Sequence, residues 1–460
     1  MATDQVGAII ESGPSDWQIV QRDANGHGVM PVAGKWVGDA PGNVQVRLVR
    51  EDSGQAVTAG LDWHDAKTNA DGTWALKLQR IPAGGLYRLE TRYRQKINKD
   101  GEWSPRGDVR HFLGVGDLWV IAGQSNSAGY GRGPVFDAPE LGVHVLRNSE
   151  QWALATHPLN ESTDTRHAVN REAANSGHSP YLRFGKRLQA ASGVPIGLIQ
   201  TSLGGSPLQQ WNPTEPGTPS LYDNMLHCVA LAGGRARGVL WYQGESDTSP
   251  EASVTYLSRF TKTVTSWRKA LKNPDLLVLT VQLNRCFFAS GEEGDRGWST
   301  VREAQRQAAR TIPGVTISPT FDLTLSDMIH ISSEGNLVLG DRMAQCALTQ
   351  LGVADAAYLA PDVEKAQLVE RGKAIRLTFS NVTSRLGCND VAANCFRVED
   401  GEGVRAIAGL EYDSANSITL RLESAVSGPV AVHGAWGVNP KQAPMDMERQ
   451  MPILGFSVGI

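Results

Sequence analysis

The spacing of apolar residues changes character twice along this chain, and these two changes restrict the possible folds most strongly. Before Gly116 and after Gly352, apolar and polar residues alternate in short runs bounded by Gly, Pro, Asn and Asp. A period of two is typical of half-buried β-strands. Between these positions, continuous apolar runs alternate with segments of helical period, which indicates β-α units on a parallel sheet. The sequence therefore predicts an α/β block between two β-rich parts.

Chain length supports this division. The 460 residues are 41% hydrophobic, and single cores rarely grow beyond about 250 to 300 residues. We predict an N-terminal β-sandwich domain at 1–114, a catalytic α/β domain at 115–352 and a C-terminal β-rich domain at 353–460. The alternating runs that suggest the outer domains are 44–48, 74–78, 87–91, 374–379, 418–422 and 430–433.

The apolar pattern of the central block predicts the positions of several helices and strands. One helix carries apolar residues at steps of three and four, which places them on one buried stripe: Val254, Leu257, Phe260, Val264, Trp267 and Leu271. Further helices are predicted at 298–311 and 333–350. The predicted strands are 118–122, 196–201, 238–242, 276–281 and 315–318.

Composition excludes several classes of partner. The formal net charge is −4 with acidic and basic residues mixed, so nucleic acid is not an expected partner. No apolar run approaches the ~18 residues that cross a bilayer, and the first ten residues lack both a basic and an apolar leader region. Five cysteines are too few for a disulfide scaffold. Cys388 and Cys395 are either a local bridge or two buried thiols.

A serine follows the first predicted strand of the block, where 118–122 runs into Gly-Gln-Ser-Asn-Ser at 123–127. Ligands of open α/β sheets bind at the carboxyl ends of strands, and free backbone N–H groups there can stabilise an oxyanion. Ser125 is therefore a candidate nucleophile, the alternative being a simple helix cap. The segment is not a Gly-x-Ser-x-Gly elbow, because Ser127 replaces the second glycine.

Polar motifs follow three further strands. Gly204 and Gly205 offer backbone N–H groups without a side chain in the way, and Gln243 and Glu245 follow the strand at 238–242. Each of these segments alone could be an ordinary loop. Asp327 lies three residues before His330, a spacing that lets a carboxylate hold the imidazole Nδ1 while Nε2 accepts a proton. Four such segments at one sheet edge favour catalysis.

These four motifs together resemble the SGNH hydrolase superfamily, and within it the sialate O-acetylesterase and acetylxylan esterase branch. That branch carries Gln-Gly-Glu, as at 243–245 here, where other members carry Gly-x-Asn. The resemblance covers about 117–348 and extends more loosely to the flanking β parts. It implies a flavodoxin-like, three-layer α/β/α domain with a parallel sheet, flanked by N-terminal and C-terminal β-sandwich-like domains.

The resemblance also implies roles for individual residues. Ser125 would be the nucleophile, His330 the general base and Asp327 the acid that orients His330, although Glu245 is an alternative acid. The oxyanion hole would use the Ser125 N–H, a backbone N–H of Gly204 or Gly205, and the Gln243 side chain. The candidate substrate-binding residues are Gln124, Asn126, Trp241, Glu245, Arg302 and Gln305. Trp211, Trp241 and Trp298 are either sugar platforms or core residues.

The implied reaction is hydrolysis of acetyl esters on carbohydrate through an acetyl-serine intermediate, with no metal or organic cofactor. Plant cell-wall xylan or xyloglucan is the favoured substrate, and O-acetyl sialic acid is the alternative. Two other possibilities are a lipid or thioester acyl hydrolase and a non-catalytic carbohydrate-binding protein. A polysaccharide esterase is expected to be secreted or periplasmic. The sequence gives no indication of oligomeric state.

Overall fold

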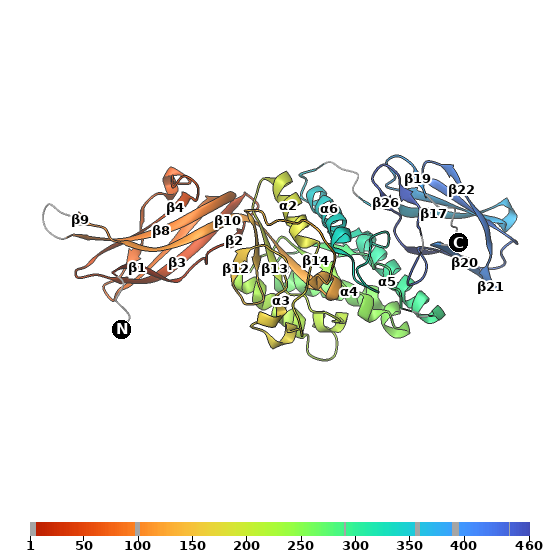
Figure 1. The fold of residues 1–460 in the computed structure, drawn as a ribbon, viewed down its shortest axis with the longest axis horizontal. Helices are drawn as coiled ribbons and strands as arrows, with labels where there is room; N and C mark the ends of the chain where they lie inside the picture. The colour runs from red at the N-terminus through yellow and green to blue at the C-terminus, as the bar shows by residue number, and fades with distance from the viewer. Residues whose placement is uncertain (1–5, 97–101, 289–290, 355–358, 389–394, 441) are drawn as a thin grey trace.

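The computed structural model describes residues 6–96, 102–288, 291–354, 359–388, 395–440 and 442–460. Three parts lie in a row along the molecule (Figure 1). An N-terminal group of long strands is at one end, a mixed α/β part is in the middle, and a C-terminal group of shorter strands is at the other end. Within the described residues no helix is long and apolar enough to cross a membrane.

The central sheet is parallel apart from one edge strand. Its strands lie in the order β12-β11-β13-β10-β14-β15-β16, and only β12 pairs antiparallel along this path. Without the β11–β12 edge pair, the order is the 2-1-3-4-5 of flavodoxin-like folds, with the direction of winding reversing beside β10. A ligand crevice is expected there. The bounds are β10 Arg106–Gly123, β11 Val143–Leu146, β12 Trp152–Leu154, β13 Ile196–Gln200, β14 Gly238–Tyr242, β15 Leu277–Val281 and β16 Val315–Ser318.

Helices cover this sheet in two layers. Helix α2 packs on α6, and α4 packs on α5; in Figure 1, α2 and α6 lie above the sheet and α3 and α4 below it. The α-helices are α1 Ser125–Ala128, α2 Tyr181–Ser192, α3 Ser220–Leu231, α4 Pro250–Ala270, α5 Gly291–Thr311 and α6 Ser333–Gln350. The 3-10 turns are η1 Ala59–Leu61, η2 Ser162–Asp164, η3 Ala168–Asn170, η4 Leu208–Trp211, η5 Glu245–Asp247 and η6 Glu370–Gly372.

The N-terminal part is joined to the centre by one strand. Residues 106–115 of β10 pair with β8, and residues 117–121 of the same strand pair with β13. The predicted boundary between 114 and 115 therefore falls inside a continuous strand. The other strands of this part are β1 Gly7–Ser12, β2 Ile19–Gln21, β3 His27–Val37, β4 Gly42–Arg50, β5 His64–Asp65, β6 Lys67–Thr68, β7 Thr73–Pro82, β8 Gly84–Lys96 and β9 Glu102–Trp103.

The described residues of the C-terminal part form two four-stranded sheets and a small three-stranded one, ordered β17-β18-β23-β22, β21-β20-β24-β27 and β19-β25-β26. Its own apolar core includes Ile375, Phe379, Val398 and Val432. Cys388 and Cys395 are both free thiols. The strands are β17 Asp362–Val369, β18 Ala374–Ser380, β19 Leu386–Gly387, β20 Phe396–Asp400, β21 Gly403–Arg405, β22 Ile407–Ser414, β23 Ser417–Leu422, β24 Ala431–Gly434, β25 Met445–Asp446, β26 Met451–Pro452 and β27 Phe456–Gly459.

The predicted central strands and helices are confirmed to within a few residues at most of their ends, although α5 begins at Gly291 rather than near 298. The prediction that Val254 belongs to the buried stripe on α4 is wrong, because its side chain is 72% exposed. Each residue advances a helix by about 100°, which carries Val254 beyond the side where Tyr256, Phe260 and Trp267 are buried. The sequence pattern gives no ranges for α2 or α3.

Candidate active site

Ser125 begins helix α1 directly after the central strand β10. The chain turns sharply at Gly123, which has a φ of 128°. A Cβ atom there would lie 2.1 Å from the backbone oxygen of Tyr242 on the neighbouring strand β14, so the close approach requires glycine. This turn places Ser125 at the carboxyl end of β10, between the segments that follow β13 and β14.

Burial distinguishes Ser125 from two neighbouring serines. The Ser127 hydroxyl donates to the Ala122 carbonyl over 2.9 Å, lies 2.8 Å from the Tyr181 hydroxyl, and accepts a 3.0 Å bond from Ser202. Ser127 and Ser202 are both fully buried. Ser125 is only partly buried, and its hydroxyl makes no hydrogen bond with the residues that the structure describes. Of these three hydroxyls, that of Ser125 can meet a substrate.

His330 is held by Asp327 from within the same loop. The imidazole Nδ1 lies 2.6 Å from Asp327 Oδ2, while Asp327 Oδ1 accepts the backbone N–H groups of Ile329 at 2.8 Å and His330 at 2.7 Å. Partial burial opposes ionisation of Asp327, but these hydrogen bonds outweigh it and hold the carboxyl pKa below its usual value. When Nδ1 donates to the carboxylate, Nε2 is left as a base.

Asn126 connects the serine turn to the histidine loop. Its Nδ2 lies 3.3 Å from the Ile329 carbonyl, and its Oδ1 accepts the Ile331 N–H at 3.1 Å. The residue after Ser125 therefore contacts both neighbours of His330. The Tyr130 ring also stacks on the His330 ring, with centroids 5.0 Å apart. The described contacts include no hydrogen bond between Ser125 and His330; in enzymes without substrate such bonds are often long.

Glu245 lies deeper than Asp327 and contacts Asn126 instead of His330. Its Oε1 accepts a 2.8 Å hydrogen bond from Asn126 Nδ2, and Oε2 is buried with no hydrogen-bond partner among the described residues. Burial raises the pKa of Glu245 to about 7. Of the two acids that the sequence leaves open, Asp327 is the one in contact with the imidazole.

Gln243 does not offer the free side-chain amide that the sequence predicts for an oxyanion donor. The side chain is fully buried. Its Nε2 lies 2.6 Å from Asp247 Oδ2, 3.2 Å from the Ser206 carbonyl and 3.3 Å from Gln124 Oε1. An amide has two N–H groups, and here both have acceptors. Gln243 therefore stabilises the loop after β14.

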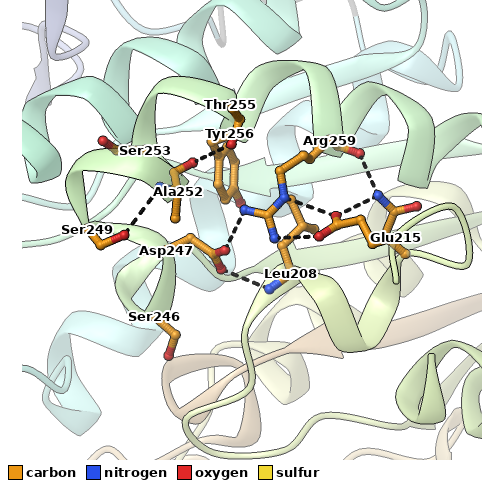
Figure 2. A network of polar contacts seen from close by, with 12 residues as sticks. Leu208, Glu215, Ser246, Asp247, Ser249, Ala252, Ser253, Thr255, Tyr256 and Arg259 are labelled. Atoms are coloured by element: carbon orange, nitrogen blue, oxygen red, sulfur yellow. Dashed lines mark hydrogen bonds and ion pairs between the residues drawn. The ribbon is translucent and has the colours of Figure 1, made fainter. Parts of the chain in front are cut away.

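A network of charged side chains holds Asp247, which is part of this loop, as Figure 2 shows. Asp247 Oδ2 accepts the Leu208 N–H at 2.8 Å, and Oδ1 lies 2.8 Å from Arg259 NH1. Arg259 also binds Glu215 through two contacts of 3.0 and 2.9 Å. Helix α4 supplies the arginine, so the loop after β14 is attached to the layer of helices beneath the sheet.

The Gly204 N–H, a predicted oxyanion donor, already has an anionic partner. It donates a 2.9 Å hydrogen bond to Oε1 of Glu172, which lies in the long segment between β12 and α2. Burial raises the pKa of Glu172, against the effect of the Gly204 bond. Gly205 has a φ of 67°. Sequence reasoning missed Glu172 because it belongs to no motif and lies in an irregular segment.

Several predicted substrate-binding residues are buried and hold the site together instead. Gln124 is 3% exposed, and its side-chain oxygen accepts the Ser246 N–H at 3.1 Å. Trp241 is fully buried, with its ring against those of Trp211 and Trp267. Trp298 is also buried. These tryptophans are core residues, and the sugar-platform interpretation is wrong for them.

Arg302 and Gln305 are fully buried as well. Arg302 donates to the carbonyls of Asn284 and Ala435, over 2.6 and 3.0 Å, so it joins the central part to the C-terminal part. Gln305 donates to the Gln243 carbonyl over 2.9 Å. The prediction that either side chain lines the pocket is wrong, because both satisfy buried backbone groups.

Exposed apolar residues instead lie beside the histidine loop. Phe287 is 49% exposed, Phe288 51% and Met328 46%. The Phe287 N–H donates to the Met328 carbonyl over 2.8 Å, which fixes these residues next to Asp327. The sequence offered little signal for them, because the segment after β15 carries no recognisable motif.

Comparisons with known proteins place this site in a family. The family described as "Carbohydrate esterase, sialic acid-specific acetylesterase" matches residues 115–349. A "probable carbohydrate esterase" of Arabidopsis thaliana is 29% identical over 275 residues, 54% of this chain and 96% of that protein. The human sialate O-acetylesterase is 22% identical over 437 residues, 82% of this chain and 80% of that protein.

A solved structure agrees in fold over nearly the whole chain. The crystal structure of a carbohydrate acetylesterase from Xanthomonas citri superposes with a TM-score of 0.68 at 23% identity, covering 96% of this chain and 98% of that one. The family match spans just over half of the chain and includes Ser125 and His330. The chain therefore belongs to the carbohydrate esterase family of sialic acid-specific acetylesterases.

Proposed function

We propose that this chain is a carbohydrate O-acetylesterase in which Ser125 forms the acetyl-enzyme. The observation that carries the proposal is the contact of 2.6 Å between His330 Nδ1 and Asp327 Oδ2. The loop that holds this pair is hydrogen-bonded to Asn126, the residue after Ser125, whose hydroxyl has no hydrogen-bond partner among the described residues. A nucleophile, a base and an acid that orients the base are the parts that acyl transfer requires.

The reaction has two steps. His330 Nε2 accepts the Ser125 proton as the hydroxyl oxygen attacks the acetyl carbonyl, and the sugar oxygen then leaves with that proton. His330 next takes a proton from water, whose oxygen attacks the acetyl-serine; the imidazolium then returns this proton to the Ser125 oxygen as acetate is released. Asp327 keeps Nδ1 protonated and stabilises the imidazolium that forms in each step.

The oxyanion that forms on the acetyl carbonyl needs N–H donors. We assign this role to the backbone N–H groups of Ser125 and Gly204. Because Glu172 accepts the Gly204 N–H in the structure, its carboxyl group must move when the oxyanion forms. Gln243 supports the site indirectly, by fixing the loop that carries Glu245.

Acetylated xylan or xyloglucan is the proposed substrate. The carboxyl groups of Glu172 and Asp327 border the site and disfavour a substrate that carries its own carboxylate. The exposed rings of Phe287 and Phe288 suit stacking on sugar rings. O-acetyl sialic acid is the second candidate, because relatives are named sialate O-acetylesterases. A polymeric substrate implies a secreted or periplasmic enzyme.

The test is acetate release from acetylated xylan, acetylated xyloglucan and O-acetyl sialic acid by the parent and by Ser125→Ala. We expect the parent to release acetate and Ser125→Ala to release none above background. A fluorophosphonate probe should label the parent and Ser127→Ala but not Ser125→Ala. If the parent releases acetate from none of these substrates or from a small acetyl ester, the proposal fails and a carbohydrate-binding role replaces it.

A further inference from the structure

A second group of reactive side chains shares no residue with the candidate active site. Glu150 is in the turn between β11 and β12, His167 lies just before η3, and His227 is on α3. His167 Nε2 is 2.7 Å and His227 Nε2 is 2.9 Å from the same oxygen, Glu150 Oε1. The three ligand atoms all lie within 4.8 Å of one another.

We propose that Glu150, His167 and His227 form a binding site for one divalent cation of the zinc class. Two imidazole nitrogens and one carboxylate oxygen are the ligands that zinc, cobalt, nickel and copper accept, whereas calcium and magnesium prefer oxygen alone. The side chains of Glu150, His167 and His227 are 25%, 27% and 47% exposed. A cation can therefore enter, and water can fill its open position.

The present geometry requires only a small adjustment to hold such an ion. Zinc binds these ligands at about 2.0 to 2.2 Å, which sets tetrahedral ligand atoms roughly 3.4 Å apart. The observed nitrogen-to-oxygen distances of 2.7 and 2.9 Å must lengthen by about 0.5 to 0.7 Å. Side chains that reach solvent can make this shift through rotation about their own bonds.

A similar cluster elsewhere shows what distinguishes this one. Asp137 lies 2.9 Å from His157 and 3.2 Å from His178, but Lys186 Nζ contacts its other oxygen at 2.5 Å. That carboxylate is already neutralised, and the group is largely buried. An added dication there would meet the lysine charge in a poorly hydrated site. Among the described residues, Glu150 forms ion pairs only with His167 and His227.

The location of the site gives it a structural consequence. His167 belongs to the segment between β12 and α2, and this segment also carries Glu172, which contacts Gly204. A cation bound to His167 would tie the segment to α3 through His227 and to the β11–β12 turn through Glu150. The segment bordering the candidate active site would then be held at a second point.

The experiment uses the full chain without a histidine tag, stripped with chelator and dialysed. Zinc stoichiometry is measured by calorimetry, and the visible spectrum is recorded after addition of cobalt(II). We expect one equivalent to bind, a rise in Tm of a few degrees, and slower proteolysis within 155–180. His227→Ala and Glu150→Gln should each weaken zinc binding by at least about 100-fold.

His111→Ala is the matched control. It also removes an imidazole that contacts a carboxylate, because His111 lies 3.0 Å from Glu51, but this pair has one histidine instead of two. It should bind zinc like the parent. Circular dichroism without metal shows whether each variant folds. If His227→Ala does not fold, His167→Ala replaces it in the binding measurement. The proposal is overturned if the folded parent binds no zinc at micromolar concentration, or if His227→Ala and Glu150→Gln bind it as tightly. These measurements do not depend on esterase activity.

Discussion

Two loops at the same edge of the central sheet each present an acidic residue, and they differ in almost every other respect. The loop after β14 holds Glu245 in a buried site, where its pKa is raised to about 7. The loop before α6 holds Asp327, whose side chain is 47% exposed and whose pKa is lowered. Burial favours the protonated form of Glu245, whereas hydrogen bonds favour the ionised form of Asp327.

This difference shows how environment divides roles between similar side chains. An ionised carboxylate beside an imidazole can stabilise a developing positive charge, so Asp327 suits chemistry. Glu245 accepts a hydrogen bond from Asn126 and helps to fix the residue next to Ser125. The loop after β14 supports the site, and the loop before α6 carries the proposed base, His330.

The largest expected effect separates the two acids by activity. We expect Asp327→Ala to lower kcat by about 10³- to 10⁴-fold, because His330 loses the group that fixes its tautomer and stabilises its charge. Glu245→Gln should lower kcat by less than about 10-fold, because the amide oxygen still accepts from Asn126. Initial rates with a small acetyl ester measure both. A greater loss in Glu245→Gln would reverse the comparison.

The second effect separates the two loops by stability. Asp247→Ala removes the acceptor of the buried Leu208 N–H and one acceptor each from Arg259 and Gln243, so we expect the free energy of unfolding to fall by about 3 to 5 kcal/mol. Asp327→Ala removes an exposed group and should lower it by about 1 kcal/mol or less. Urea titration of both variants measures the difference. Equal losses would show that the loop after β14 is no more firmly held than the histidine loop.

The third effect is a pH dependence that belongs to Glu245. Its ordinary pKa of 4.5 is raised to about 7 in the folded protein, so between these values the folded state keeps a proton that the unfolded state releases. This contribution to stability is present below pH 4.5 and is lost as pH rises to about 7, by about 3 kcal/mol in all.

The glutamine in Glu245→Gln cannot ionise, so this variant should not show this loss of stability as pH rises. Its Tm relative to the parent should therefore rise between pH 4.5 and 7 and then remain level. Asp327→Asn is the contrasting control: because the Asp327 pKa is lowered, its contribution to stability is lost as pH falls. Parallel Tm profiles for the parent and Glu245→Gln would contradict a raised pKa at Glu245.

The smallest effect concerns Glu172, the acid that sequence reasoning missed. Removing its charge weakens the hydrogen bond that holds the Gly204 N–H, so the oxyanion can compete for this donor more easily, and Glu172→Gln should raise kcat/KM by about 3- to 10-fold at pH 8. Burial raises the pKa of Glu172, and below that pKa the carboxyl is neutral. The variant and the parent should therefore converge at acidic pH. A fall in kcat/KM would instead make Glu172 a substrate-binding residue.

Sequence periodicity predicted the central strands closely because each is a continuous apolar run buried on both faces. The range 238–242 coincides with β14, and 315–318 with β16. Motif order at strand ends also predicted which segments converge, since parallel strands finish at one edge. The contact between Asp327 and His330 could be expected from their spacing alone, because it is local.

Side-chain burial could not be predicted in the same way. Gln243, Arg302 and Gln305 are polar residues near the site, and sequence gives no sign that buried backbone carbonyls and a buried carboxylate occupy their donors. Glu172 lies 32 residues from its partner Gly204 in an irregular segment. Contacts of this kind depend on the path of a loop, which no periodicity records.

The continuous strand β10 has a consequence for how this protein can be divided. It begins in the N-terminal β part and ends at Gly123, two residues before Ser125. Asp117, fully buried within it, binds Arg22 on one side and Arg237 on the other. A catalytic fragment that starts at residue 115 would cut this strand in two and remove Arg22 from a buried charge. The N-terminal part thus shares a strand with the support of Ser125, unlike an accessory module on a flexible linker.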